Sequence, residues 1–471
     1  MKVLLLAVAA AAAATIPAAQ SQPISDAIRP FVNVDAPLVA FTHARVIDGT
    51  GAPAREDQTL VIRDGLIAAL GTAADVVVPA GATILDLSGR TVMPGLVMVH
   101  EHLYYPTGPG VYGQLGESFV RLYLAGGVTS MRTGGNVNGF MDLNMKRLTA
   151  SGRKAGPDID ATAPYLNGPN NFIQMRSMEG PADARRQVAY WADEGATSFK
   201  AYMNITRSEL GAAIEEAHKR GIKITGHLCS VTYGEAADLG IDNLEHGFLA
   251  STDFVADKQP DVCPQGRRTQ ESLLALDENG AAFTALVKKL VAKNVALTST
   301  LTVFETFTPG RPIPPGLDVL VAPLKEQFER THARTAANAR SPYLTLFPKA
   351  MALERAFAKA GGLLIAGTDP TGSGGVIPGY SNQRALELLV EAGFTPLEAI
   401  RIGTLNGARY LGRDARIGSI AQGKQADLIV INGNPAADIA HVRNVETVFK
   451  RGVGFDPAKL IESVKGRVGL W

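Results

Sequence analysis

Hydrophobic and polar residues alternate with two different rhythms along this chain. From Val39 to Leu87, short alternating runs are separated by Asp-Gly and other glycine-containing turns, and the same texture returns near the C-terminus in GSIAQGKQADLIVINGNP and VETVFKRGVG. This pattern is typical of β-strands joined by tight turns. Neither stretch is long enough to enclose a core of its own. We therefore expect both ends of the chain to build one small composite β-sandwich.

The centre of the chain has the other rhythm, in which short apolar runs alternate with amphipathic segments. Eight runs predict strands: GLVMVHEH, GVTSMRT, DIDATAPYL, TSFKAY, KITGHL, DNLEHG, VALTSTL and LLIAGTD. Between several of them, RSELGAAIEEAHKRG, AAFTALVKKLVAKN and ALERAFAKAGG place apolar residues at helical spacing and stop at Gly or Asn. Strands alternating with helices in this way predict an α/β fold, a (β/α)₈ barrel of the TIM type.

The same patterns predict the domain boundaries. The start, Met1-Lys2, is positively charged, Val3 to Ala14 is an unbroken apolar run, and Ala19 and Ser21 have the spacing that signal peptidases prefer. We expect a signal peptide over residues 1–21, with a retained anchor as the alternative. The first part of the β-sandwich then covers residues 22–93, the barrel 94–412 and the second part of the sandwich 413–471. The mature protein is expected to be periplasmic or secreted.

Composition and charge narrow the classes of function. Lys and Arg number 46 and Asp and Glu number 45, so the net charge is +1. This balance provides no basic field for nucleic acid and no polybasic membrane patch, and favours an enzyme or binding protein for a small molecule or dipeptide. Whether the chain forms a homo-oligomer stays an open question.

The expected export bears on the two cysteines, Cys229 and Cys263, because cysteines can pair in an oxidising compartment. If the barrel is right, both lie on loops that leave neighbouring strands at the same face. A disulfide and two separate buried thiols are then equally good interpretations. Cys263 belongs to a long connection, from Leu249 to about Glu278, of the kind that forms a lid or an inserted recognition element.

Residues that can bind metal stand at the ends of the predicted strands. His100 and His102 end the first strand, and the period-two alternation turns both to one side while Glu101 points away. Further along, the strand ends carry Lys200, His227, His246 and Asp369. In a barrel the carboxyl ends of the strands meet at one face, so these six side chains should converge.

Taken singly, each of these residues has an ordinary structural explanation, such as a hydrogen-bonded core histidine or a turn aspartate. Their coincidence changes the weighing, because four of the eight histidines, one Asp and one Lys fall at the ends of five different strands in the same orientation. The remaining histidines receive no catalytic role; they are His43, His218, His332 and His441.

The motifs MPGLVMVHEH, SFKAY, ITGH, NLEHG and AGTDP together resemble the amidohydrolase superfamily. The ending TPLEAIRIGTLNGARYLGRDARIGSIAQGKQADLIVINGNP is similar to its imidazolonepropionase-like and Xaa-Pro-type dipeptidase branch. The resemblance implies a centre of two divalent metal ions. His100 and His102 match the ligands of one metal, His227 and His246 match those of the other, and Lys200 matches a carboxylated bridging lysine.

The resemblance also implies a metal-dependent hydrolase that acts on C–N bonds. Asp369 matches a metal ligand that also serves as the catalytic acid and base, and the nucleophile would be a hydroxide that bridges the metals. Imidazole and carboxylate ligands without thiolate suit zinc best. The chain departs from the family's pattern after His227, where many relatives have an aromatic residue two positions on and this chain has Cys229.

Substrate recognition is expected from the loops after the strands. The predicted substrate-binding residues are Arg132, Tyr165, Tyr202, Tyr233, Arg267 and Arg268, with Asn167 and Arg176 as further candidates. Arg267 or Arg268 could hold a substrate carboxylate through a bidentate pair. The branch suggests an amide bond in a dipeptide or an N-acyl amino acid.

Two other functions stay open, namely a lactonase or other ester hydrolase on the same two metals, and a non-catalytic binding protein with the amidohydrolase fold. A mononuclear deaminase or imidazolone hydrolase of the same superfamily would not need Lys200, so both are disfavoured.

Overall fold

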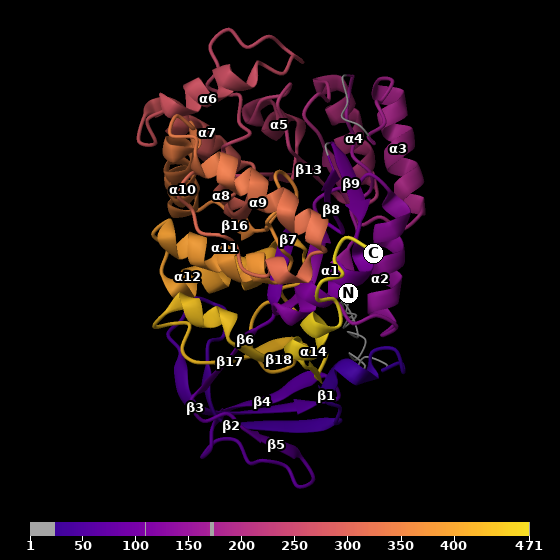
Figure 1. Cartoon of the computed structure of the whole chain (residues 1–471), viewed down its shortest axis with the longest axis vertical. Coiled ribbons are helices and arrows are strands. Elements are labelled where there is room, and N and C mark those ends of the chain that lie inside the picture. Colours follow the sequence, from indigo (N-terminus) through magenta and orange to yellow (C-terminus); the bar gives the residue numbers. More distant parts are fainter. Residues whose placement is uncertain (1–23, 109, 170–173, 471) are drawn as a thin grey trace, which may run out of the picture.

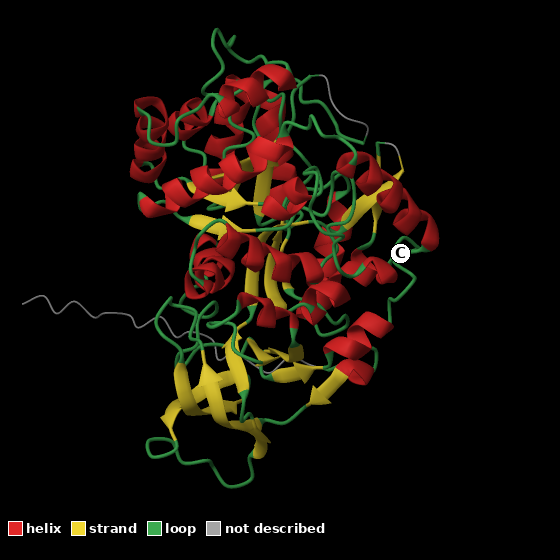
Figure 2. Ribbon diagram, turned by 60° about the vertical axis from the view of Figure 1, so that its left-hand side comes forward, coloured by secondary structure: helices red, strands yellow, loops and turns green. Residues whose placement is uncertain are grey.

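The computed structural model describes residues 24–108, 110–169 and 174–470 of the chain. The predicted signal peptide, residues 1–21, lies outside the described residues. Within them the fold is a mixed α/β fold, with one sheet built from both ends of the chain and a central set of parallel strands flanked by helices (Figures 1 and 2).

Strands from the two ends of the chain pair in a single nine-stranded sheet, which lies at the bottom of Figure 1. They are β1 (Val32–Val34), β2 (Leu38–Val46), β3 (Arg55–Arg63), β4 (Leu66–Thr72), β5 (Thr83–Asp86), β6 (Arg90–Pro94), β17 (Leu428–Asn432), β18 (Val445–Lys450) and β19 (Val453–Phe455). The order is β1-β19-β18-β17-β6-β2-β3-β4, and β5 pairs with β2. β17 pairs with β6 in antiparallel orientation, so the sheet joins segments more than 300 residues apart in the sequence. Its closure into a composite β-sandwich stays a prediction.

Local sequence explains why this sheet forms. Asp64 and Gly65 connect β3 to β4 with φ of 49° and 79°, the left-handed pair that a two-residue hairpin requires and that Asp-Gly supplies at low cost. The inward-facing apolar residues form a core of their own, in which the rings of Phe41 and Phe449 lie 5.0 Å apart.

Eight central strands run parallel to their neighbours and match the eight runs predicted from the sequence. Three of them, β7 (Leu96–Glu101), β10 (Val128–Thr133) and β11 (Asp158–Asp160), form one sheet in the order β11-β10-β7. The other five form a second sheet in chain order: β12 (Ser198–Ala201), β13 (Lys223–Gly226), β14 (Asn243–Leu244), β15 (Ala296–Ser299) and β16 (Leu364–Ala366). Nearly all of their residues are buried, as expected for strands covered on both faces.

The two parallel sheets adjoin at both ends. On one side, the segment after β11 bridges to β12, pairing Thr162 with Ser198. On the other side, the amides of Thr368 and Asp369, just beyond β16, both donate to the carbonyl of His100 in β7 over 3.1 Å. The carboxyl ends of strands from both sheets are thereby brought close together.

Helices surround these strands (Figure 2). They are α1 (Gly116–Ala125), α2 (Gly139–Ala150), α3 (Pro181–Asp193), α4 (Arg207–Lys219), α5 (Tyr233–Leu239), α6 (Gly266–Leu274), α7 (Ala281–Ala292), α8 (Leu301–Glu305), α9 (Ala322–Ala336), α10 (Tyr343–Lys359), α11 (Tyr380–Glu391), α12 (Pro396–Arg401), α13 (Gly407–Tyr410) and α14 (Pro457–Glu462). Shorter helical turns cover Arg29–Phe31, Leu317–Val319, Ile402–Asn406 and Ile439–Arg443, and a hairpin of β8 (Tyr104–Gly108) and β9 (Val111–Gln114) follows β7. Among the described helices, none has the length and apolar character that a membrane span needs.

A buried ionic cluster ties the nine-stranded sheet to the parallel strands. Lys450, at the end of β18, is fully buried and places its Nζ 2.9 Å from Asp158 Oδ1 at the start of β11. Arg451 donates to the other oxygen of Asp158 over 2.7 Å. Burial alone would raise the pKa of Asp158, but the two cations lower it to about 2. The carboxylate is therefore ionised at neutral pH and holds the two parts of the molecule together.

Replacing Asp158 with Asn should destabilise the protein by about 3–5 kcal/mol, because it leaves the buried ammonium of Lys450 without a counter-charge. Since the pKa of Asp158 is lower in the folded than in the unfolded chain, its contribution is present above pH about 4 and is lost as the pH falls towards 2. Urea unfolding at pH 7 and pH 3 measures both effects. As the control, Glu215→Gln removes an exposed partner of Arg185 and should change stability by less than about 1 kcal/mol. Equal stability of both variants would contradict the conclusion that Asp158 holds the two parts of the molecule together.

Candidate metal centre

Two fully buried histidines leave the end of β7 on the same side. His100 is the second-last residue of the strand and His102 follows it, so strand alternation turns both imidazoles one way. Glu101 points the other way, as predicted, and accepts hydrogen bonds from the Thr368 hydroxyl and, over 2.9 Å, from the Asn382 amide.

Asp369, just beyond β16, lies opposite these histidines. Its Oδ1 is 3.2 Å from His102 Nε2 and 3.8 Å from His100 Nε2. One donor atom from each of the three residues lies within 4.8 Å of the others, a spacing at which a single metal ion can be held.

The other three predicted ligands surround the same group. Lys200 of β12 places Nζ 3.1 Å from His100 Nε2. The ring of His246, just after β14, lies 4.7 Å from that of His100, and its Nδ1 is 3.7 Å from Asp369 Oδ2. The ring of His227, just after β13, lies 4.3 Å from that of His246. The structure therefore brings all six side chains together from the ends of five strands.

Two of these residues have a backbone conformation that residues other than glycine rarely adopt. His246 has φ of 68° and Asp369 has φ of 56°, in the left-handed region where a non-glycine residue costs about 1–3 kcal/mol. Such conformations persist where the surrounding structure fixes them, and they cluster at functional sites. Here they turn both side chains towards the centre.

Hydrogen bonds fix which ring nitrogen of His100 and of His102 faces the centre. His102 Nδ1 lies 2.9 Å from the carbonyl of Gly135, and because a carbonyl only accepts, Nδ1 must carry the proton. His100 Nδ1 bonds to Glu245 Oε2 over 2.7 Å. Nε2 of both rings is thus left with a lone pair that points at Asp369 and Lys200. This is the arrangement in which outer partners orient metal-binding histidines.

Glu245 in turn is held by Arg132, whose Nη2 lies 2.5 Å from Glu245 Oε1. Burial would raise the pKa of Glu245, but the Arg132 guanidinium holds it well below its usual range, so the carboxylate stays ionised. Sequence analysis did not single out Glu245. Its position directly before His246 was visible, but its contact with His100 crosses between strands.

Burial also sets the protonation of the donors. It lowers the pKa of His102 to about 4 and that of His227 to about 3, so both rings are neutral at pH 7. Burial likewise lowers the pKa of Lys200 to about 8. Neutral imidazoles whose lone pairs face the centre, beside a carboxylate, are the donor set that a divalent metal ion such as zinc binds. The residues present therefore fit a metal ion.

The sequence profile of the amidohydrolase family matches residues 91–454, which include all six converging side chains. This chain belongs to the amidohydrolase family. It is a hydrolase of that type, as the sequence predicted.

Individual relatives of this amidohydrolase are distant. Imidazolonepropionase from Herpetosiphon aurantiacus is 25% identical over 425 residues, which cover 82% of this chain and 89% of that protein. Enamidase from Eubacterium barkeri is 28% identical over 191 residues, or 37% of this chain and 45% of that protein. Adenine deaminase 3 from Rhizobium meliloti is 36% identical over 85 residues, or 18% of this chain and 13% of that protein. The chain thus matches less than half the length of the last two.

Solved structures resemble this amidohydrolase over most of its length. A candidate prolidase from Bifidobacterium longum aligns with a TM-score of 0.68 and 24% identity, covering 91% of this chain and 98% of that one. A Xaa-Pro dipeptidase with bound methionine aligns with a TM-score of 0.67 and 19% identity, covering 89% and 100%. At these identities the likeness shows the shared fold.

Of the predicted substrate-binding residues, Tyr165 and Tyr202 lie beside the histidines. Tyr202 meets the ring of His227 edge to face at 4.9 Å, and Tyr165 packs on Tyr202 at 4.8 Å. Sequence analysis missed Tyr104, which stacks on His102 at 4.4 Å and bonds through its hydroxyl to that of Tyr165. The aromatic residue two positions after His102 was the available signal.

The structure gives Arg132 and Tyr233 internal partners in place of the predicted contact with substrate. Arg132 is fully buried against Glu245, and Tyr233, also buried, donates its hydroxyl to the carbonyls of Glu245 and Gly247. Through these contacts, both residues position the segment that carries His246.

The predicted Arg267 and Arg268 lie on α6, in the long connection at the top of Figure 1. Arg267 is mostly exposed and pairs with Glu271 at 2.8 Å, and Arg268 donates to the carbonyl of Ala256 over 2.6 Å.

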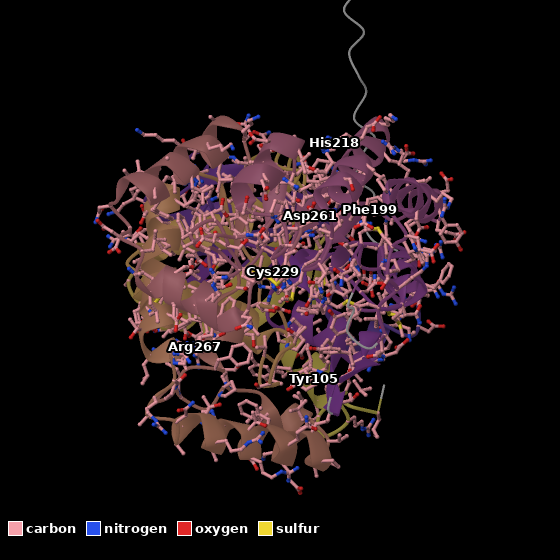
Figure 3. All side chains as sticks on the ribbon, turned by 90° about the horizontal axis from the view of Figure 1, so that it is seen from above. Tyr105, Phe199, His218, Cys229, Asp261 and Arg267 are labelled. Atoms are coloured by element: carbon pink, nitrogen blue, oxygen red, sulfur yellow. A yellow bond between two sulfur atoms is a disulfide. The ribbon has the colours of Figure 1, made fainter. Side chains whose placement is uncertain are left out.

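A disulfide joins Cys229 to Cys263, with Cα atoms 4.8 Å apart, and resolves the alternative that the sequence left open (Figure 3). It connects the loop two residues after His227 to the long connection from Leu249 to Glu278. Since 34 residues separate the two cysteines, the cross-link removes considerable freedom from the unfolded chain.

The double variant Cys229→Ser/Cys263→Ser should lose about 3–4 kcal/mol of stability, the loop-closure contribution for a loop of this length. Thermal unfolding with and without reductant measures it. Reductant should lower the unfolding temperature of the wild type and leave that of the double variant unchanged. Two titratable thiols in the wild type purified without reductant would contradict the cross-link.

Proposed function

We propose that this amidohydrolase is an exported, metal-dependent enzyme that cleaves an amide bond in a small peptide-like substrate, such as a dipeptide or an N-acyl amino acid. The observation that carries the proposal is the convergence of four histidines, three of them buried, with Lys200 and Asp369 at the ends of five strands. An arrangement with this many oriented donors in a water-poor interior serves metal chemistry better than it serves stability.

We infer that the eight parallel strands are those of a (β/α)₈ barrel, and that the sheet from the two chain ends closes as its composite β-sandwich. The hydrogen bonds at both junctions of the parallel sheets support the barrel. In such a barrel the carboxyl ends of the strands form the catalytic face, which accounts for where the six side chains lie.

His100 and His102 would hold one divalent metal ion, and His227 and His246 a second. Lys200 Nζ lies 3.1 Å from His100 Nε2, and a carbamate formed from its neutral amine and carbon dioxide would serve as a ligand shared by both ions. The lowered pKa of Lys200, about 8, leaves a sizeable fraction of the neutral amine near pH 7–8. Two ions held there would supply the Lewis acidity that activates water and polarises a carbonyl group.

Asp369 is the group placed to move protons. Its carboxylate faces the histidines, and one oxygen accepts a hydrogen bond from the Thr371 hydroxyl over 2.8 Å, which fixes its orientation. From this position Asp369 accepts a proton from the attacking water and delivers it to the leaving nitrogen. The products are the amine and the carboxylic acid, which at neutral pH exchange a proton to become an ammonium and a carboxylate.

The names of the relatives support a substrate with a carbon–nitrogen bond, since they include an imidazolonepropionase, an enamidase and a Xaa-Pro dipeptidase. The near-zero net charge agrees with a small-molecule substrate rather than nucleic acid. The disulfide supports export, because disulfides persist in oxidising compartments such as the periplasm.

Asp369→Asn should lower kcat about 10²–10⁴-fold on the best substrate among dipeptides and N-acyl amino acids, because the amide cannot accept the proton. Asn tolerates the left-handed backbone at this position, so the fold should survive. The control is Asp64→Asn, the same substitution at another left-handed position, in the hairpin between β3 and β4; its kcat should equal that of the wild type.

Wild-type turnover by Asp369→Asn would contradict the role of Asp369. Hydrolysis of lactones alone, with every amide left intact, would contradict the proposed amidase activity.

A further inference from the structure

Aromatic rings contact three of the proposed metal ligands. Tyr104 stacks on His102 with an interplanar angle of 24°, and Tyr202 meets His227 edge to face. Phe304 meets His246 edge to face at 6.0 Å. These rings come from segments that follow three different strands, β7, β12 and β15.

Further rings extend both contacts into continuous surfaces. Tyr165 links Tyr104 to Tyr202, and Tyr343 packs on Phe304 at 6.3 Å and on Phe307 at 5.4 Å. We call the six residues Tyr104, Tyr165, Tyr202, Phe304, Phe307 and Tyr343 the aromatic wall. Its two parts contact different histidines.

The wall is not simply core. Tyr104 and Tyr165 are buried, but the other four members are half-buried, so part of each of those rings is open. Open apolar surface next to a polar centre is characteristic of a binding site, because a ligand can cover it and gain the free energy of burial.

The partners of the predicted substrate-binding arginines argue against a carboxylate as the group that the wall binds. Each of these arginines is already paired within the protein. For Arg132, Arg176, Arg267 and Arg268 these partners are Glu245, Asp183, Glu271 and the carbonyl of Ala256. The wall itself consists of rings and phenol groups and offers stacking and edge-to-face contacts.

We propose that the aromatic wall binds an aromatic ring carried next to the scissile amide, so that the substrates are aryl-bearing amides such as derivatives of phenylalanine. This inference rests on the proposed amidase function and specifies its substrate class. Aromatic pairs favour offset-stacked and edge-to-face geometries, and Phe304 already adopts both, edge to face with Phe307 and stacked with Tyr343.

The test compares kcat/KM for matched amides that differ in one side chain: phenylalanine, cyclohexylalanine and alanine, each as the N-acetyl amino acid and as the glycyl dipeptide. The phenylalanine compounds should exceed the alanine compounds by about tenfold or more, the gain expected for burying a large apolar side chain. They should exceed the cyclohexylalanine compounds by about three- to tenfold, the contribution of ring–ring contacts.

Two variants place this preference on the wall. Phe304→Leu and Tyr343→Leu should each lower the ratio of kcat/KM for phenylalanine to that for alanine by about three- to tenfold. The control is Tyr190→Leu, which removes a half-exposed ring on α3 and should leave the ratio unchanged. Metal content and unfolding temperature of each variant show that the centre and the fold persist.

The outcomes separate the two proposals. If the metal-loaded protein hydrolyses none of the amides, the proposed function fails. If it hydrolyses them with equal kcat/KM for phenylalanine and alanine or for phenylalanine and cyclohexylalanine, or if the two wall variants keep the wild-type ratio, the function stands and the aromatic wall is overturned as the substrate site.

Discussion

The burial of polar donors around Asp369 is the constraint on which the rest of the structure depends. Four imidazoles, an amine and a carboxylate are gathered in an interior where each would be costly without partners. The protein meets this cost in two ways. Burial keeps His102 and His227 neutral, and outer partners such as Glu245 and the Gly135 carbonyl satisfy the nitrogens that face away from the centre. The nitrogens that face inward are left with lone pairs, which is a strong reason to expect a metal ion there.

The remainder of the fold can be understood as support for that arrangement. Arg132 neutralises Glu245, Tyr233 holds the carbonyls on either side of His246, and the disulfide fixes the loop after His227. Farther away, Lys450 and Arg451 of the chain's C-terminal part hold Asp158 at the start of β11. Segments remote in sequence thus limit the movement of strands whose ends carry the ligands, and a site that needs ångström-level geometry benefits from such rigid supports.

Much of the fold and the convergence of the six side chains could be predicted from the sequence, because strand alternation and apolar runs are local signals. Helices α4 and α7 were predicted nearly to their ends for the same reason. By contrast, α10 begins at Tyr343, nine residues before the predicted segment, because Pro348 interrupts the pattern that the sequence shows. The mainly polar α6 was missed, since its hydrophobic face is short.

The contacts between strands could not be predicted. Glu245 reaches His100 across 145 positions, and the sequence alone does not tell whether Arg132 or Tyr233 faces a ligand or the core. The aromatic wall is a further case, because its members come from separate loops and only the fold brings their rings together. For the same reason the pairing of Cys229 with Cys263 stayed open until the two loops were placed side by side.

The central claim is that the six converging side chains hold two metal ions, with Lys200 between them. Metal content per chain, measured by elemental analysis on the purified wild type beside Lys200→Ala, tests it most directly. The account predicts about two divalent ions per chain in the wild type and a clear loss of metal in the variant, at unchanged secondary structure. One ion or none in a folded wild type purified without chelator, or the same content in both proteins, would contradict it.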